Sequence, residues 1–204
     1  MKQKKNKLAL IILLISIFLF LYPSISNNIN KRKFINTLKN YTPISKSEYQ
    51  KLKDYNKNIK QDKYDLISNN KIMGYISIPK IDLILPIYFH SDDKTIKRGV
   101  GHIEWSSFPT DGKNIHSLLV SHNGLPGIKL FDDIYKLKEG DFFYIYIYNK
   151  RLKYVIDNIN IVNPNDTSHS QVINNKNYVS LVTCTPYGIN SHRLLVRGEL
   201  KRTD

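Results

Sequence analysis

Cysteine is almost absent from this chain: Cys184 is the only one among 204 residues, so no internal disulfide framework can form. Glycine and proline are modest in number, and the sequence contains neither an internal repeat nor a glycine-rich phosphate-binding loop. The six histidines show no pairing with cysteine of the kind that zinc sites need. These absences exclude a disulfide scaffold, a repeat array and a zinc domain, and we expect neither a cofactor nor a bound metal.

Acidic residues are scarce in the first part of the chain. Residues 1–80 hold 16 Lys+Arg and only 4 Asp+Glu, whereas residues 81–204 hold 15 and 13. The formal net charge of +14 therefore belongs to the N-terminal part, and the remainder is close to neutral. A nucleic-acid-binding domain would carry the basic excess itself. We therefore expect no nucleic-acid partner and attribute the basic excess to a nearby membrane.

Residues 1–26 have the pattern of a cytoplasmic basic tip followed by a membrane anchor. Four lysines precede an apolar run over residues 8–22. This run spans about 22 Å as a helix, which is enough to cross a thin or locally adapted bilayer. The lysines place the N-terminus in the cytoplasm and the rest of the chain outside. The segment Ser24-Ile25-Ser26 also fits a signal-peptide cleavage site, so a cleaved signal peptide is the alternative to an uncleaved signal-anchor.

Residues 27–72 are polar, rich in lysine and typical of a helical spacer or arm. The sequence predicts helices over residues 31–40 and 45–60, with Ser45 or Ser47 as the N-cap of the second. Three apolar residues of the second helix recur at spacings of three and four and could pack on the folded domain: Leu52, Tyr55 and Ile59. Alternatively, the whole arm is solvated.

Residues 73–204 form the folded domain. Its tyrosines and isoleucines favour a mostly β structure, and seven or eight short strands predict a closed or nearly closed β-barrel with short helices. The predicted strands cover residues 74–81, 83–89, 117–122, 142–148, 152–156, 178–182 and 192–196. The first contains a proline and is expected at a sheet edge. Short helices are expected over residues 92–98 and 129–136, and a turn over residues 99–102.

The stretch over residues 181–198 contains the candidate reactive groups. Cys184 ends one strand, Pro186 and Gly188 indicate a loop, and Arg193 opens the next strand. If the strands pair as a hairpin, the thiol and the guanidinium lie at the same end of the sheet, as a nucleophile and its oxyanion partner would. On general tendencies, however, a lone cysteine is more often a small buried hydrophobe, and a strand arginine is more often a solvated charge.

His122 is the histidine with a candidate role. It closes an apolar strand and precedes a turn rich in glycine and proline, from where it could project over a groove toward Cys184. His192 adjoins Arg193 and points to the opposite face of its strand. The remaining histidines show no partner chemistry in the sequence: His90, His102, His116 and His169.

Several ordered motifs across residues 73–200 match one family. The longest runs Thr183-Cys184-Thr185-Pro186-Tyr187, then Asn190-Ser191-His192-Arg193-Leu194-Leu195-Val196-Arg197-Gly198. The others are residues 74–81, Leu85-Pro86-Ile87-Tyr88, Gly99-Val100-Gly101-His102, Ser121-His122-Asn123-Gly124-Leu125-Pro126 and Lys129-Leu130-Phe131. Together they closely resemble the signature of sortases, particularly the class C (pilin-assembling) sortases.

This resemblance implies a sortase-like eight-stranded β-barrel in which Cys184 is the nucleophile, His122 the general acid/base and Arg193 the stabiliser of the oxyanion. It implies a membrane-anchored cysteine transpeptidase that cleaves an LPXTG-like sorting signal, forms a thioester and transfers the acyl group to an amine. The implied partners are surface or pilin proteins with a sorting signal, and an amine acceptor, either a pilin lysine or a peptidoglycan cross-bridge.

The sequence departs from the class C pattern in two places. Class C sortases usually carry a lid with an Asp-Pro-aromatic motif, but this chain has no Asp-Pro; Gln61 to Asp65 is the only candidate, and we expect no functioning lid. Many class C members also have a C-terminal membrane helix, whereas this chain ends at Asp204 in charged residues. A cysteine hydrolase that only cleaves and a non-catalytic wall-binding barrel are the alternative functions.

Overall fold

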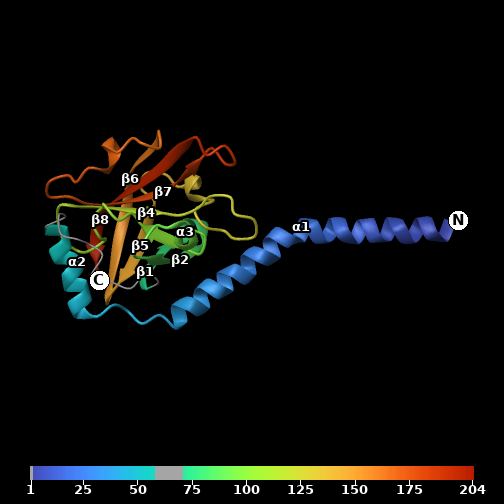
Figure 1. Cartoon of the computed structure of the whole chain (residues 1–204), viewed down its shortest axis with the longest axis horizontal. Coiled ribbons are helices and arrows are strands. Elements are labelled where there is room, and N and C mark those ends of the chain that lie inside the picture. The colour runs from blue at the N-terminus through green and yellow to red at the C-terminus, as the bar shows by residue number, and fades with distance from the viewer. Residues whose placement is uncertain (1, 58–70) are drawn as a thin grey trace.

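The computed structural model describes residues 2–57 and 71–204, which form two N-terminal helices and a closed eight-stranded β-barrel (Figure 1). Around the barrel the strands follow the order β1-β2-β3-β4-β7-β8-β6-β5. The strands are β1 (Ile72–Ile78), β2 (Leu83–Tyr88), β3 (Val100–His102), β4 (Ile115–Val120), β5 (Phe142–Ile147), β6 (Lys150–Val162), β7 (Asn177–Thr185) and β8 (His192–Thr203). The helices are α1 (Lys2–Lys39), α2 (Lys46–Lys57), α3 (Asp93–Ile96) and the 3-10 turns η2 (Pro79–Ile81), η3 (Ile134–Lys136) and η4 (Ser168–Ser170). The predicted mostly β barrel is confirmed.

The barrel has no free edge at β1, which corrects the prediction that its first strand lies at a sheet edge. β1 pairs with β2 on one side and with β5 on the other. The proline that suggested an edge, Pro79, lies beyond the end of β1 and opens η2. Its missing N–H therefore removes no bond from the strand ladder.

Other element boundaries also differ from the predictions. The expected turn over residues 99–102 contains β3, a strand too short for its sequence to show a pattern. β4 ends before His122, and most of the expected helix over residues 129–136 is not helical, because only η3 forms there. β6 continues to Val162, past the predicted end at residue 156, because it pairs with β8 over most of its length.

The barrel interior is filled by side chains that alternate along the strands. In β5, Phe143, Ile145 and Ile147 are fully buried, and the residues between them face outward. Burial of each such side chain contributes about 1.5–3 kcal/mol. The interior is therefore a packed core rather than a channel, and reactive groups must lie on the outside or at the ends.

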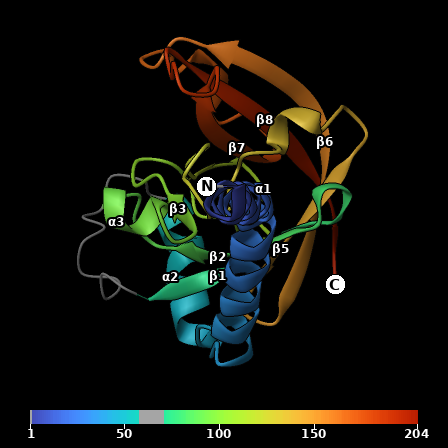
Figure 2. The same ribbon diagram turned by 90° about the vertical axis from the view of Figure 1, so that its right-hand side faces the viewer.

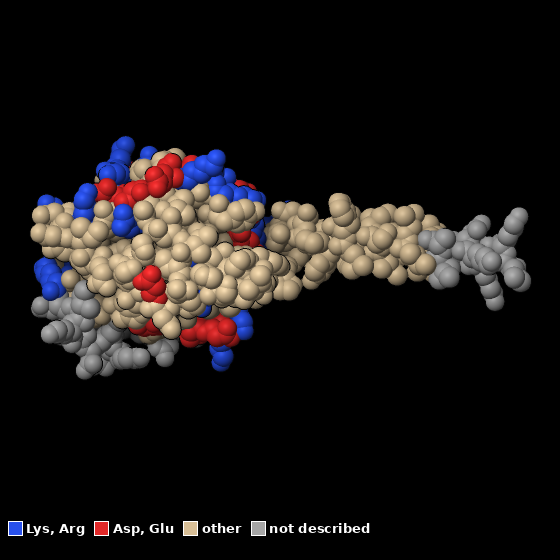
Figure 3. All heavy atoms as spheres, turned by 90° about the horizontal axis from the view of Figure 1, so that it is seen from above, with Lys and Arg blue, Asp and Glu red and all other residues tan. Residues whose placement is uncertain are grey.

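Helix α1 is one continuous helix, where the sequence predicted a separate anchor and spacer. One part projects from the barrel and the other lies along it, with a bend between them (Figures 1 and 2). Pro23 lies inside the helix, where it removes a backbone hydrogen bond and favours such a bend. The helix is long and apolar enough to cross a membrane. Residues 8–30, which include the apolar projecting part and the start of the part that lies along the barrel, contain no charged residue (Figure 3). The predicted boundary between residues 26 and 27 thus falls inside a helix and stays a prediction.

The second part of α1 is attached to the barrel by Phe34, which packs against the core, and by polar contacts. The Ser26 hydroxyl donates a hydrogen bond of 2.8 Å to the Gly127 carbonyl, and the Asn30 side-chain amide donates to the same oxygen. Lys31 forms an ion pair with Asp82 at the start of β2. These contacts fix the direction in which the projecting part leaves the barrel.

Helix α2 begins with a capping box. The Ser45 hydroxyl accepts a hydrogen bond of 3.2 Å from the Glu48 N–H, and the Glu48 carboxylate accepts one of 2.7 Å from the Ser45 N–H. Of the two predicted candidates, Ser45 and Ser47, Ser45 is therefore the N-cap. Leu52 and Tyr55 are buried in the core, as the spacing predicted, and Ile59 lies outside the described residues.

The capping box makes the stability of the chain depend on pH through Glu48. A hydrogen bond from Lys71, together with that from the Ser45 N–H, lowers the pKa of Glu48 from 4.5 to about 2. Because the pKa is lower in the folded chain, the stabilisation is complete above about pH 5 and is lost as the pH falls toward 2. We expect Glu48→Gln to lower the free energy of unfolding by about 1 kcal/mol at pH 7, since the pair with Lys71 is partly exposed.

Urea unfolding of the full chain in detergent, followed from pH 7 to pH 3, measures this effect. The difference between Glu48→Gln and the parent should shrink as the pH falls. Asp54→Asn on the same helix is the control, because its partners Lys57 and Gln50 are exposed and it should change stability much less. A difference that stays constant down to pH 3 would contradict the linkage.

Candidate active site

The hairpin of β7 and β8 places Cys184 opposite Arg193. The two residues are directly paired in antiparallel register, so their side chains stand on the same face, with Cβ atoms about 4.5–5.5 Å apart. The loop between the strands is tight, because the N–H groups of Ile189 and Asn190 both donate to the Pro186 carbonyl, at 3.2 and 2.9 Å. The predicted hairpin is therefore confirmed.

Cys184 lies on the outer face of the barrel. Along β7, Val179 and Leu181 belong to the core, so the alternate residues Val182 and Cys184 face outward. Outside the barrel lies a small outer apolar cluster made by Val120, Val162, Val182 and Leu195. The thiol is free and half-buried, so a ligand on the outer surface can meet it with this cluster alongside.

His122 reaches the same end of the barrel from β4. β4 runs parallel to β7, and the pairing continues past the strand end: the Ser121 N–H donates to the Val182 carbonyl at 3.2 Å. The Thr183 hydroxyl donates to the Ser121 carbonyl at 2.9 Å, and the Asn123 side chain donates to the Cys184 carbonyl at 3.2 Å. His122 therefore lies between two residues that are hydrogen-bonded to residues 183 and 184.

The loop after His122 is held by a carboxylate. The two oxygens of Asp132 accept hydrogen bonds from the N–H groups of Gly124 and Leu130, at 2.9 and 2.7 Å. The Phe131 N–H donates to the His122 carbonyl at 3.0 Å. These bonds close the loop on itself and fix the backbone on the C-terminal side of His122.

A second carboxylate lies beside His122, and the sequence did not predict it there. Nε2 of His122 is 3.6 Å from Oδ1 of Asp93 in α3, and the Asp93 carboxylate also pairs with Lys97 at 2.5 Å. The Lys97 ammonium holds the pKa of Asp93 below its usual range, and His122 adds to this effect, so the carboxylate is ionised at neutral pH. Asp93 lies in the short helix predicted over residues 92–98, but nothing in the sequence linked that helix to His122.

Arg193 is held by backbone carbonyls. Its Nη1 donates to the carbonyls of Asn190 and His192, at 3.1 and 3.0 Å. Over residues 2–57 and 71–204, no carboxylate forms an ion pair with it. Its charge is therefore not neutralised by the described part of the protein and is available to a ligand beside Cys184.

A depression of about 500 Å³ lies between the loop after His122 and the β7–β8 loop. Its lining includes Asn123, Thr185, Tyr187 and Leu194. Thr183 and Thr185 alternate with Cys184 along β7, so the depression lies on the opposite face of the hairpin from the thiol.

Two other histidines have structural partners. His102 is buried in β3, where Nε2 lies 2.8 Å from the Ser107 carbonyl. His116 is buried in β4 between the Gln171 carbonyl and the Ser180 hydroxyl, at 2.9 and 2.8 Å, and burial lowers its pKa. The described residues contain no group of three or more His, Cys, Asp or Glu that could hold a metal ion.

Comparison with known proteins identifies the family. The model of the sortase domain matches residues 76–201, which is more than half of the chain. Sortase A of Bacillus anthracis is 29% identical over 137 residues, which cover 67% of this chain and 63% of that relative. The matched part thus spans less than two thirds of that protein.

Solved structures agree in fold and sequence. Sortase C1 of Streptococcus agalactiae is 39% identical with a TM-score of 0.72, covering 85% of this chain and all of that one. Sortase C of Clostridium perfringens, solved with the C-terminal cell wall sorting motif, is 38% identical with a TM-score of 0.72, covering 84% of this chain and 97% of that one. The match over residues 76–201 shows that this chain belongs to the sortase family, and the closed barrel agrees with it. The candidate lid, Gln61 to Asp65, lies outside the described residues.

The packing of Tyr187 on Gly124 predicts a steric link between the two loops of the site. Gly124 has φ +88°, and a Cβ atom there would collide with the Tyr187 ring. Gly140 has φ +89°, but a Cβ atom there meets nothing within 4 Å. We expect Gly124→Ala to push the Tyr187 ring away from the loop after His122 and to lower kcat/KM on a sorting-signal peptide about tenfold or more. Gly140→Ala should share only the backbone strain of about 1–2 kcal/mol.

Peptide cleavage and urea unfolding, measured on both variants, separate the two effects. Both variants should lose similar stability, and only Gly124→Ala should lose activity beyond that. The double variant Gly124→Ala/Tyr187→Ser should recover part of the lost activity. Equal activity of the two alanine variants would contradict the steric link.

Proposed function

We propose that this sortase is a membrane-anchored cysteine transpeptidase that cleaves an LPXTG-like sorting signal and transfers the acyl fragment to an amine. The observation that carries the proposal is the register of β7 and β8, which pairs Cys184 with Arg193, with His122 brought alongside by β4. A thiol, an imidazole and a permanently charged guanidinium on one outer surface suit nucleophilic acyl transfer.

In the first step, the Cys184 thiolate forms a C–S bond to the carbonyl carbon of the scissile peptide bond. The charge that develops on the carbonyl oxygen is stabilised by Arg193, whose guanidinium lies on the same face. The C–N bond then breaks, and protonated His122 gives its proton to the departing amine. The product is a thioester on Cys184 and a neutral His122.

In the second step, an amine attacks the thioester carbonyl. The C–S bond breaks, the thiolate returns, and His122 takes the proton that the amine releases. A thioester suits this sequence because it persists until an amine arrives. Transfer to an amine, rather than to water, separates a transpeptidase from a hydrolase.

The similarity to sortases C supports a role in pilus assembly or in attachment of proteins to the cell wall. The substrates would be pilin or surface proteins that carry a sorting signal. The acceptor would be a pilin lysine or the amine of a peptidoglycan cross-bridge. The sorting motif solved with the Clostridium perfringens enzyme supports the substrate class.

The apolar helix α1 supports a single-pass membrane location. The lysines of residues 1–7 favour a cytoplasmic N-terminus, which puts the barrel outside the cell. The enzyme would then meet its substrates at the outer surface of the membrane.

The first test follows the acyl-enzyme. Wild-type protein incubated with LPXTG-like peptides should gain the mass of the acyl fragment, and Cys184→Ala should gain none, because no other cysteine exists. Mass spectrometry of the intact protein measures the adduct. Added amine should convert the adduct into an amide product. An adduct on Cys184→Ala would place the nucleophile elsewhere, and hydrolysis alone in abundant amine would indicate a hydrolase.

The second test concerns Arg193. A lysine ammonium is a point charge that cannot reproduce the planar guanidinium, so we expect Arg193→Lys to lower kcat/KM about 100-fold or more. Arg197→Lys is the control, because Arg197 lies on the same face of β8 but is bound by both oxygens of Asp157, at 3.1 and 2.9 Å. It should lose far less activity. Full activity of Arg193→Lys would contradict the proposal that Arg193 stabilises the oxyanion.

A further inference from the structure

The loop after His122 contacts α1 just beyond the end of its apolar run. The Gly127 carbonyl accepts hydrogen bonds from Ser26 and Asn30, and a Cβ atom on Gly127 would lie 3.8 Å from the Tyr22 hydroxyl oxygen. Tyr22 is the last residue of the apolar run. Tyrosine at the end of such a run lies at the membrane–water interface. The loop at Gly127 therefore lies at the level where the apolar part of α1 ends.

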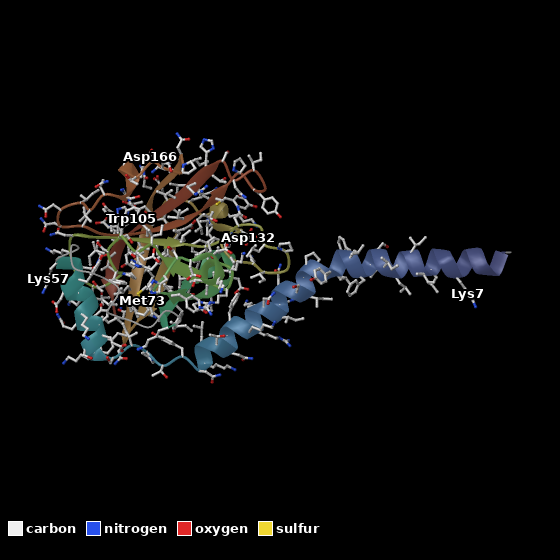
Figure 4. The ribbon with its side chains drawn as sticks, viewed as in Figure 1. Lys7, Lys57, Met73, Trp105, Asp132 and Asp166 are labelled. Atoms are coloured by element: carbon white, nitrogen blue, oxygen red, sulfur yellow. The ribbon has the colours of Figure 1, made fainter. Side chains whose placement is uncertain are left out.

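Two large apolar side chains stand on the neighbouring β7–β8 loop. Tyr187 is 70% exposed and Ile189 is 73% exposed. Tyr187 also lines a cavity of about 470 Å³ together with Tyr22, Pro23 and the segment over residues 124–129. The loop lies on the side of the barrel from which α1 projects, the side on which Asp132 is seen (Figures 1 and 4). The loop that carries these exposed side chains therefore lies on the side of the barrel that a bilayer around α1 would cover.

We propose that Tyr187, Ile189 and the exposed Pro126 form a membrane-contact patch that rests in the head-group layer of the bilayer. The inference depends on the proposed anchoring by α1. Because the patch lies next to that anchor, we infer that a lipid bilayer covers it, rather than another protein. An aromatic ring with a polar tip suits this layer, and an aliphatic side chain gains by leaving water there.

The patch orients the active site toward the membrane. Tyr187 and Ile189 lie in the loop between Cys184 and Arg193, so contact of this loop with lipid places the reactive end of the hairpin at the membrane surface. A polypeptide still held in the outer leaflet could then reach Cys184 without a long free segment.

The test uses the full chain in vesicles, with one environment-sensitive fluorophore on a single cysteine. Ile189→Cys carries it in one sample and Ile173→Cys in the other, both in a Cys184→Ser background. Ile173 is also exposed (42%) and in a loop, but it precedes β7, whereas Ile189 follows it. The nine-residue strand separates the two ends by about 26 Å. The vesicles contain phosphatidylcholine and a lipid with a spin label on its head group.

We expect the spin-labelled lipid to quench the fluorophore at position 189 and not the one at position 173, in both zwitterionic and anionic vesicles. Co-flotation with the vesicles tests α1 separately. Protein that floats but shows no preferential quenching at position 189 overturns the membrane-contact patch and leaves the anchor intact. Protein that does not float overturns both. Quenching at position 189 that appears only at high protein-to-lipid ratio, and without spin-labelled lipid, identifies a second copy of the chain as the occupant and overturns the patch.

Discussion

The parallel pairing of β4 with β7 is the constraint on which the candidate active site depends. Parallel strands end at the same edge of a sheet, so the residues after β4 and at the end of β7 meet without any direct link in sequence. The bonds from Ser121 to Val182 and from Asn123 to Cys184 extend this pairing beyond β4. β8 then returns antiparallel and brings Arg193 to the same place. A barrel that paired β4 elsewhere would keep the hairpin and lose His122.

The period of two along the strands decides where the chemistry faces. Val179 and Leu181 must enter the core, which commits Cys184 to the outside, and Leu194 and Val196 commit Arg193 in the same way. A shift of one residue in register would bury the thiol and the guanidinium together. The core and the site are therefore specified by the same alternation, and the outer apolar cluster shows that the outside of these strands is not purely polar.

Local features of this structure could be predicted from the sequence, and long-range ones could not. The β7–β8 hairpin, the cap at Ser45 and the burial of Leu52 follow from patterns within a few residues. The sequence offered His122 as a candidate partner of Cys184, and the resemblance to sortases strengthened it, because parallel pairing across many residues leaves no local pattern. Asp93 was missed for the same reason. β3 and the continuity of α1 through Pro23 escaped prediction because tertiary packing overrides weak local signals.

The loop between β4 and η3 connects the anchor with the reactive groups. Gly127 has φ +74°, and a Cβ atom there would lie 2.5 Å from the Ser26 hydroxyl, so the approach of α1 requires glycine for two independent reasons. The same loop is closed by Asp132 at Gly124 and begins with Asn123, which binds the Cys184 carbonyl. Any displacement of α1 against the barrel therefore acts first on the segment that flanks His122, without passing through the core. The direction of the anchor and the geometry of the site are set by one short stretch of backbone.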